Sequence, residues 1–273
     1  MHPKISFCLL LLASAVAACG GGDASTTRIT LSGSSTIAPV IAEIASRYEM
    51  QHPEVRIDVQ TGGSSRGIRD AIDGLADFGM SSRALKQGEA PELESRVLAR
   101  DGVAFLVHAS NPVSMLSNGQ LLDIYRGKID NWAQLGGLDA PITVITRAAG
   151  RSEFTLFSDY FGFPANDIAA DLIAGENQQA IKSVIGNPNA IVYISIGSSE
   201  YEIQHGQPLK LLPLDGVAAS SQTIASGQFP MGRVLLLLHQ PGLSPAAQAF
   251  LDYALSAEVS DLIEAQGFVA QSH

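Results

Sequence analysis

Apolar and polar positions follow a repeating order in the first third of the chain: a short apolar run, a glycine- and serine-rich loop, then an amphipathic pattern. The runs at 28–31 and 55–59 have the length and composition of β-strands. After each loop, apolar residues recur at three- and four-residue spacing over 37–48 and 68–75, which predicts two helices. A third short strand is expected to end at 81–82. The pattern predicts an α/β fold in which small hydroxyl residues follow three strands.

These serine-rich loops are the first candidates for chemistry. The carboxyl ends of parallel strands lie along one edge of an open α/β sheet, so loops that follow different strands can converge on one crevice. A helix N-terminus presents unpaired backbone N–H groups and the positive end of its dipole, and hydroxyl groups add donors. Any one such loop is also typical of a plain turn or helix cap, but several together favour a cleft for a small oxyanion. The hydroxyl residues of these loops include Ser34, Ser35, Thr36, Ser64, Ser65 and Ser82.

A second α/β pattern follows a buried strand expected at 102–108. Its strand at 142–146 leads into a loop with two arginines, Arg147 and Arg151, and then into a helix over 154–161. Further helices are expected near 120–125, 177–185, 246–255 and 259–265, and strands at 190–195 and 233–238, with a turn-rich segment from 196 to 227.

The order of these elements predicts two α/β lobes, each a mixed sheet flanked by helices, with two crossing strands as the hinge. Lobe 1 is expected to comprise 28–108 and 230–273. Lobe 2, at 109–229, is inserted between these two parts.

The N-terminus has the features of an export signal: a lysine, an apolar core, and small residues before Cys19. Residues 16–19, Val-Ala-Ala-Cys, resemble the lipobox of bacterial lipoproteins, whose Cys is acylated and becomes the first residue after cleavage. We therefore expect a signal peptide at 1–18, a palmitate-bearing anchor at Cys19 and a flexible linker at 19–27. Gly20 favours the outer membrane if the cell is Gram-negative, on the periplasmic side. The alternative is an ordinary secretory signal followed by a free Cys.

Composition narrows the range of partners. The 273 residues carry a formal charge of −10, and loss of the signal removes one Lys and no acid, which leaves −11. Nucleic-acid binding is not expected, because it needs a concentrated positive surface. Both cysteines, Cys8 and Cys19, precede the mature domain, which therefore has neither a disulfide nor a cysteine metal cluster. The histidines lack metal-ligand spacing, and we expect no metal and no cofactor.

Six short motifs occur in order along the mature chain. They are Gly33-Ser34-Ser35-Thr36, Gly63-Ser64-Ser65, Asp77-Phe78-Gly79-Met80-Ser81-Ser82, Asp123-Ile124-Tyr125-Arg126-Gly127-Lys128-Ile129 with Asn131-Trp132, Arg147-x-x-Gly150, and Gln266-Gly267-Phe268-Val269. Together they resemble the phosphate-binding protein of bacterial ABC phosphate importers, a type II periplasmic binding protein. The resemblance covers essentially the whole mature chain. It implies a monomer without enzymatic activity, whose two lobes close over inorganic phosphate and whose partners are ABC permease subunits in the inner membrane.

The resemblance also implies roles for single residues. Thr36 and the backbone of Ile37 would hold phosphate from the first loop, Ser64 from the second, and Arg147 from the second lobe. This chain departs from the family at two positions. Ser82 stands where the family often has an Asp that accepts the proton of phosphate, and Arg151-Ser152-Glu153 replaces the family's Ser-Gly-Thr.

These departures suggest a substitute for the missing Asp. A carboxylate at an oxyanion site repels its ligand unless the ligand brings a proton to share, and sulfate has none at neutral pH. We hypothesise that Glu153 accepts the proton of phosphate in place of the family's Asp, whose position is Ser82 in this chain. Arg151, which is close to Glu153 in sequence, would offset the negative charge of Glu153.

Other interpretations remain open from the sequence. The ligand could be another oxyanion, such as sulfate or molybdate, and the closed protein could dock a sensor instead of a permease. Gly63-Ser64-Ser65-Arg66-Gly67 also matches G-x-S-x-G, which would make Ser65 a hydrolase nucleophile with His239 as its base. Arg66 and Arg83 suit a ligand contact and a salt bridge equally, whereas Tyr125 and Trp132 are expected to pack in the core.

Overall fold

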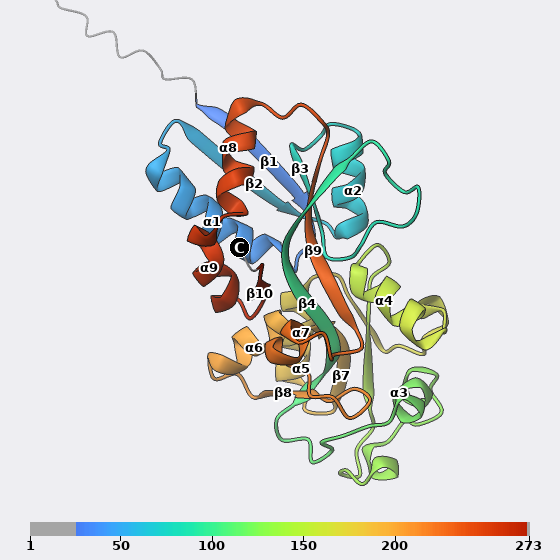
Figure 1. Ribbon diagram of the computed structural model, residues 1–273. Helices are drawn as coiled ribbons and strands as arrows, with labels where there is room; N and C mark the ends of the chain where they lie inside the picture. Colours follow the sequence, from blue (N-terminus) through green and yellow to red (C-terminus); the bar gives the residue numbers. More distant parts are fainter. Residues whose placement is uncertain (1–25, 272–273) are drawn as a thin grey trace, which may run out of the picture.

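The computed structural model describes residues 26–271, which form two lobes connected by long strands (Figure 1). The expected signal peptide, Cys19 and most of the linker lie outside the described residues. Within the described part of the chain, no helix has both the length and the apolar character needed to cross a membrane.

The strands form one continuous hydrogen-bonded path in the order β2-β1-β3-β9-β4-β7-β5-β6, with β8 and β10 attached to β4. They are β1 (Thr27–Gly33), β2 (Val55–Thr61), β3 (Phe78–Ser81), β4 (Glu94–His108), β5 (Thr143–Arg147), β6 (Leu172–Ala174), β7 (Ala190–Ser195), β8 (Leu209–Leu212), β9 (Gly232–His239) and β10 (Val269–Ala270). β1 runs parallel to β2 and β3, and β5 runs parallel to β6 and β7. Each lobe therefore contains parallel strands, as the sequence pattern predicts, and the carboxyl ends of these strands lie at one edge of the sheet.

β4 and β9 link the lobes. The first part of β4 pairs antiparallel with β9, and its last residues pair with β7 and β8 of the other lobe. Figure 1 shows both strands running from one lobe towards the other. The expectation of two linking strands is thus confirmed, whereas the exact residues that divide the lobes stay a prediction.

The helices alternate with the strands along most of the described chain. They are α1 (Ala38–Gln51), α2 (Ser64–Ile72), α3 (Asn118–Tyr125), α4 (Ser152–Phe161), α5 (Asn177–Gly186), α6 (Ile196–Gln204), α7 (Ser221–Ala225), α8 (Pro245–Ala254) and α9 (Ser260–Ala265), with short 3-10 helices at Trp132–Leu135, Ala165–Asp167 and Ala257–Val259. In α1 the residues spaced three and four apart are the buried ones, and Pro39 is tolerated in the first turn because the N–H it lacks has no partner there anyway.

Each lobe has its own apolar core. In lobe 1, side chains of α1 and α8 pack against β1, β3 and β9, with Tyr48, Phe78 and Phe250 as large buried members. In lobe 2, an aromatic group that includes Phe105 and Phe157 fills the space beside β4 and β7. Tyr125 and Trp132 are fully buried members of the lobe 2 core, so their expected packing role is confirmed. Separate cores allow the lobes to move as units about the linking strands.

Several sequence-based boundaries were wrong. The expected strand at 102–108 begins at Glu94, because the polar residues before Asp101 still pair with β9. Leu75 lies beyond the end of α2 and is 71% exposed, so it does not belong to the apolar face of that helix. The segment 196–227, expected to be turns, contains α6, β8 and α7. The prediction failed because the many Ser, Gly and Pro residues of this segment are typical of turns. The short elements are stabilised by packing on β4 and β7.

Gly67 fixes the approach of α2 to the sheet. A Cβ at this position would lie 2.5 Å from the Ser32 carbonyl oxygen and 2.7 Å from that of Met80. Gly67→Ala is expected to lower the free energy of unfolding by about 1–3 kcal/mol, because overpacking against backbone outweighs the roughly 1 kcal/mol by which Ala favours a helix. Urea unfolding measures the change. Gly186→Ala is the matched control, since nothing lies within 4 Å of its Cβ position at the end of α5, and it should not destabilise the protein.

Candidate functional site

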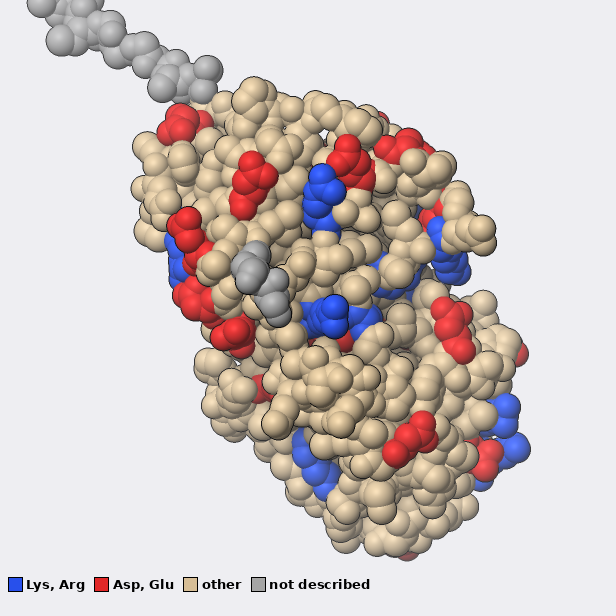
Figure 2. All heavy atoms as spheres, viewed as in Figure 1, with Lys and Arg blue, Asp and Glu red and all other residues tan. Residues whose placement is uncertain are grey.

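The serine-rich loops of both lobes meet at the junction of the lobes. The N-termini of α1, α2 and α4 follow the ends of β1, β2 and β5, and the loop after β3 joins them. The backbone N–H of Ser65 donates to the Gly150 carbonyl oxygen of lobe 2 at 3.2 Å. On the face shown in Figure 2, Lys and Arg atoms gather between the two lobes. The predicted convergence of the loops is therefore observed, in a closed arrangement of the lobes.

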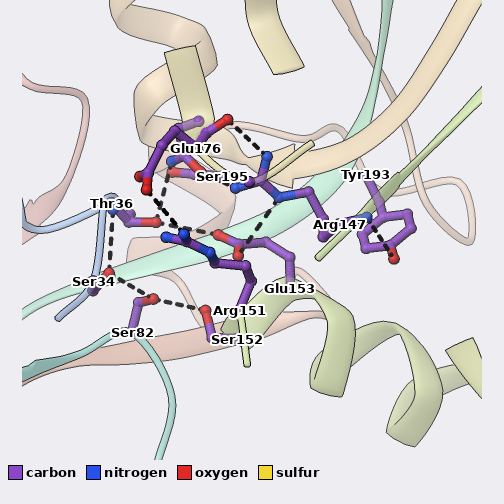
Figure 3. A network of polar contacts seen from close by, with 12 residues as sticks. Ser34, Thr36, Ser82, Arg147, Arg151, Ser152, Glu153, Glu176, Tyr193 and Ser195 are labelled. Carbon is purple, nitrogen blue, oxygen red and sulfur yellow. Dashed lines mark hydrogen bonds and ion pairs between the residues drawn. The ribbon is translucent and has the colours of Figure 1, made fainter. Parts of the chain in front are cut away.

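Four buried serines form a hydroxyl cluster across the junction. Ser34 Oγ donates to Ser82 Oγ at 2.9 Å, and Ser82 Oγ lies 2.7 Å from Ser152 Oγ of lobe 2. The Ser82 backbone N–H donates to Ser64 Oγ at 3.0 Å. Figure 3 shows the first three hydroxyls side by side. The structure thus brings together serines predicted from four separate loops.

Arg147 lies at the end of β5 and is completely buried. Its Nη1 donates to the Glu176 carbonyl oxygen and its Nη2 to Asn177 Oδ1. Its Nε lies 3.9 Å from Glu153 Oε2 and has no hydrogen-bond partner among residues 26–271. Burial lowers the pKa of this guanidinium, although the charge of Glu153 opposes the shift. A buried N–H donor without a partner is costly, which makes it a strong candidate for contact with a ligand.

Glu153 carries the buried carboxylate of the site. It belongs to the first turn of α4, where the helix dipole favours negative charge. Its Oε1 accepts from Thr36 Oγ1 at 3.1 Å and from Arg233 Nη1 at 2.9 Å. Burial opposes ionisation, but the charges of Arg233 and Arg147 outweigh it and lower the pKa of the carboxyl to about 2. The carboxylate is therefore ionised at neutral pH, and it can accept a hydrogen bond from a ligand that carries a proton.

The role assigned to Arg151 in the hypothesis was wrong. Its Nη2 donates to Glu176 Oε1 at 2.9 Å, so it pairs with that acid and not with Glu153. The side chain leaves the N-terminus of α4 towards the turn before α5, and Figure 3 shows it beside Glu176. Arg233 supplies the charge balance instead. Within the described chain, Arg151 Nη1 is a second buried donor without a partner.

Three buried residues of the site escaped sequence reasoning: Asp101, Asn177 and Arg233. Asn177 Nδ2 donates to Thr36 Oγ1 at 3.1 Å, across the lobe junction. Arg233 Nη2 donates to the same hydroxyl at 3.2 Å and to Asp101 Oδ2 at 2.7 Å. Two of them had a signal in the sequence: Asp101 and Arg233 are charged residues at the edges of the apolar runs that form the linking strands. Since charge is rarely buried without a partner, this position could have indicated a buried ion pair.

The other predicted positions lie nearby with less direct roles. The Ile37 backbone N–H points to Ser34 Oγ at 3.4 Å, so it is directed into the hydroxyl cluster. Ser35 is half-buried and lines a groove of about 260 Å³ together with Asn177 and Tyr201. Ser65 is half-buried at the start of α2. Its side chain has no hydrogen bond to His239 in the part of the chain that the structure describes, and that ring contacts the Gln240 carbonyl oxygen.

The remaining candidate cations form salt bridges. Arg66 pairs with Asp70 at 3.1 Å and Arg83 with Glu89 at 2.6 Å. Both open cases from the sequence are therefore resolved in favour of the ion pair. Residues 26–271 contain no group of three or more His, Cys, Asp or Glu side chains that could hold a metal ion.

This arrangement suits one kind of ligand. Hydroxyl and guanidinium donors bind Oε1 of the ionised Glu153 carboxylate, and its Oε2 lies 3.9 Å from Arg147 Nε. An oxyanion that also carries a proton could accept from the donors and donate to the carboxylate. A fully ionised oxyanion would meet the carboxylate as a like charge.

Comparison with known proteins agrees with the fold. Residues 21–258 match the family model of the PBP superfamily domain. A candidate phosphate ABC transporter substrate-binding protein from Clostridium perfringens, solved with bound phosphate, is 32% identical with a TM-score of 0.83 and covers 90% of this chain and 100% of its own. An ABC-type phosphate transport receptor from Vibrio cholerae is also 32% identical, with a TM-score of 0.71 and the same coverage.

Curated relatives point to the same group. The phosphate-binding protein PstS of Bacillus subtilis is 26% identical over 257 residues, which are 91% of this chain and 82% of that protein. Proteins of this kind bind solutes and are not enzymes, so the expectation of a non-enzymatic protein is confirmed and the serine hydrolase alternative loses its support. The chain belongs to the PBP superfamily and, within it, to the PstS-like proteins of the two-lobe type II fold.

Proposed function

We propose that this protein captures inorganic phosphate between its lobes, outside the cytoplasm, and delivers it to an ABC importer. The observation that carries the proposal is the buried, partnerless Arg147 Nε, which lies 3.9 Å from the ionised Glu153 carboxylate in a chain whose relatives are phosphate-binding proteins. Arg151 Nη1 is a second buried donor without a partner among residues 26–271. The protein is proposed to act as a monomer without a cofactor, with permease subunits of the inner membrane as partners. The proposed ligand-binding residues are Ser34, Ser35, Thr36, Ile37, Ser64, Ser65, Ser82, Arg147, Arg151, Ser152 and Glu153.

Phosphate fits this site because it is both an acceptor and a donor near neutral pH. Its charged oxygens would accept from Arg147 Nε and from the serine hydroxyls, in charge-assisted hydrogen bonds. Its P–OH group would donate to Glu153, which replaces the acid missing at Ser82. Sulfate carries no such proton, so the same carboxylate would repel it. Opening of the lobes admits the ligand, and closure would report occupancy to the permease.

Titration calorimetry tests the proposal directly. A soluble form that begins after Cys19 is freed of bound ligand, and phosphate, sulfate and molybdate are injected in parallel. Tight phosphate binding, with a Kd for sulfate far above the Kd for phosphate, is the expected result. Preferred binding of sulfate or molybdate would reassign the ligand, and absence of any oxyanion binding would contradict the proposal. Transport and sensing share this site, and phosphate uptake by cells that lack the protein tells them apart.

The N-terminus carries a separate proposal, that Cys19 is lipidated. In Cys19→Ser, radiolabelled palmitate is expected to be lost from the protein, because the thiol that carries the acyl chain is absent. The variant should also leave the membrane fraction unless the uncleaved signal holds it there. Cys8→Ser is the control, since this cysteine lies inside the signal and should not affect labelling. Equal palmitate incorporation in Cys19→Ser would contradict lipidation at this residue.

A further inference from the structure

Arg233 reaches the site from a linking strand and belongs to neither group of loops. It lies near the start of β9, directly opposite Asp101 of β4, and both side chains are 1% exposed. Its Nε and Nη2 donate to Asp101 Oδ2 at 3.0 and 2.7 Å. A buried guanidinium with a carboxylate on one edge still has donors left on its other edge.

The free edge of Arg233 points to both lobes. Nη1 donates to Ser152 Oγ at 2.7 Å and to Glu153 Oε1 at 2.9 Å in lobe 2. Nη2 donates to Thr36 Oγ1 of lobe 1 at 3.2 Å. One side chain therefore joins the linking strands, the hydroxyl cluster and the buried carboxylate.

Asp101 is itself fixed, which makes Arg233 a rigid support. Asp101 Oδ2 accepts from Ser195 Oγ at 2.8 Å, and Oδ1 accepts from the Gly197 backbone N–H at 3.0 Å. These bonds tie the ion pair to the start of α6 in lobe 2. Each of the five guanidinium N–H groups of Arg233 has an acceptor, so the plane of this side chain has little freedom to rotate.

We propose that Arg233 is the positioning residue for oxyanion selectivity: it holds and charge-balances the Glu153 carboxylate, so that this carboxylate accepts the proton of a protonated oxyanion. The inference rests on the proposed function, since it explains how that site would tell phosphate from sulfate. Arg233 acts through Glu153 and the closed junction of the lobes.

The charged neighbours of Glu153 show why Arg233 is needed. Arg233 of β9 is in hydrogen-bond contact with Glu153, and Arg147 of β5 is 3.9 Å away. Burial raises the pKa of the Tyr193 phenol of β7, and the charge of Glu153 contributes to that rise. Asp101 reaches Glu153 only through Arg233. A buried carboxylate that loses its hydrogen-bonded cation tends to take up a proton. Protonated Glu153 would donate a hydrogen bond, and the site would then favour a fully ionised oxyanion.

The experiment compares the Kd for sulfate with the Kd for phosphate by titration calorimetry, from pH 5 to 8. In Arg233→Gln the ratio of the two Kd values is expected to fall by about tenfold or more, the effect of one charge-assisted hydrogen bond. Arg233→Lys keeps the charge and should restore most of the ratio at pH 8. A single ammonium holds the carboxylate less firmly, so in Arg233→Lys the ratio should fall, relative to wild type, as the pH decreases. Arg47→Gln is the matched control, because Arg47 pairs with Asp261 away from the site.

Each outcome separates this inference from the proposed function. If the wild type does not bind phosphate, the proposed function fails. If it binds phosphate and rejects sulfate, but Arg233→Gln keeps the wild-type ratio at every pH, only the inference about Arg233 is overturned. Circular dichroism checks folding of each variant. Should Arg233→Gln not fold, the pH profile of Arg233→Lys decides, and a profile equal to that of the wild type overturns the inference.

Discussion

Replacing Arg147 with Gln is expected to raise the Kd for phosphate by about 100-fold or more. The change removes a buried charge and the partnerless Nε donor, and a charge-assisted hydrogen bond with its Coulomb attraction contributes about 3 kcal/mol in such a site. It also frees Asn177, which Arg147 holds through Nη2 and which in turn donates to Thr36. Contacts with the ligand would therefore be weakened in both lobes.

Titration calorimetry with phosphate measures the effect of Arg147→Gln. Arg83→Gln is a suitable control, because Arg83 is also a buried arginine in an ion pair, with Glu89, and is not among the proposed ligand contacts. It should bind phosphate with nearly the wild-type Kd. A folded Arg147→Gln that also keeps the wild-type Kd would show that the anion does not sit at the end of β5.

The predictable part of the fold is the part that local pattern controls. The spacing of Val40, Ile41 and Ile44 marks the buried face of α1, and Pro39 marks its start, so α1 followed from the sequence alone. α6 and β8 did not, since their Ser-, Gly- and Pro-containing sequence is locally turn-like. They form because β4 offers partners, with Leu212 paired to Phe105. Such tertiary support has no signature in a short window.

The candidate site also has a part that could be predicted from the sequence and a part that could not. Its serines and Arg147 were predictable, because they follow strands and such ends meet at one edge of a sheet. Arg233 was not, because its partner Asp101 lies 132 positions away and nothing local pairs the two. Because no local signal identified Arg233, the wrong arginine was assigned as the partner of Glu153. Arg151 is near it in sequence, but the helical turn at α4 directs Arg151 to Glu176 and Glu153 to Arg233.

Glu153→Gln is expected to reverse the selectivity of the site. The amide can donate a hydrogen bond to a fully ionised oxygen, so sulfate binding should strengthen, while phosphate loses the acceptor for its proton. The ratio of the Kd for sulfate to the Kd for phosphate should fall by about 100-fold, since each of the two changes is worth roughly one charge-assisted hydrogen bond. Calorimetry at pH 7 measures this ratio.

The same substitution has a stability signature in acid. The pKa of Glu153 is about 2 in the folded protein, below its ordinary value of 4.5, so the ionised group stabilises the fold above pH 4.5. That contribution, on the order of 3 kcal/mol, is lost as the pH falls towards 2. In urea unfolding, the free energy of the wild type should therefore decrease more steeply between pH 5 and 2 than that of Glu153→Gln.

Glu89→Gln separates the two effects. The hydrogen bond from Arg83 also lowers the pKa of Glu89 to about 2, so this variant should show a similar change in acid stability. Glu89 is not among the proposed ligand contacts, and its loss should leave the ratio of Kd values unchanged. If Glu153→Gln changed acid stability alone and kept the selectivity, Glu153 would be a structural ion-pair partner. The proton of phosphate would then need another acceptor, and Glu176, whose Oε2 lacks a partner among residues 26–271, is the next carboxylate at the junction.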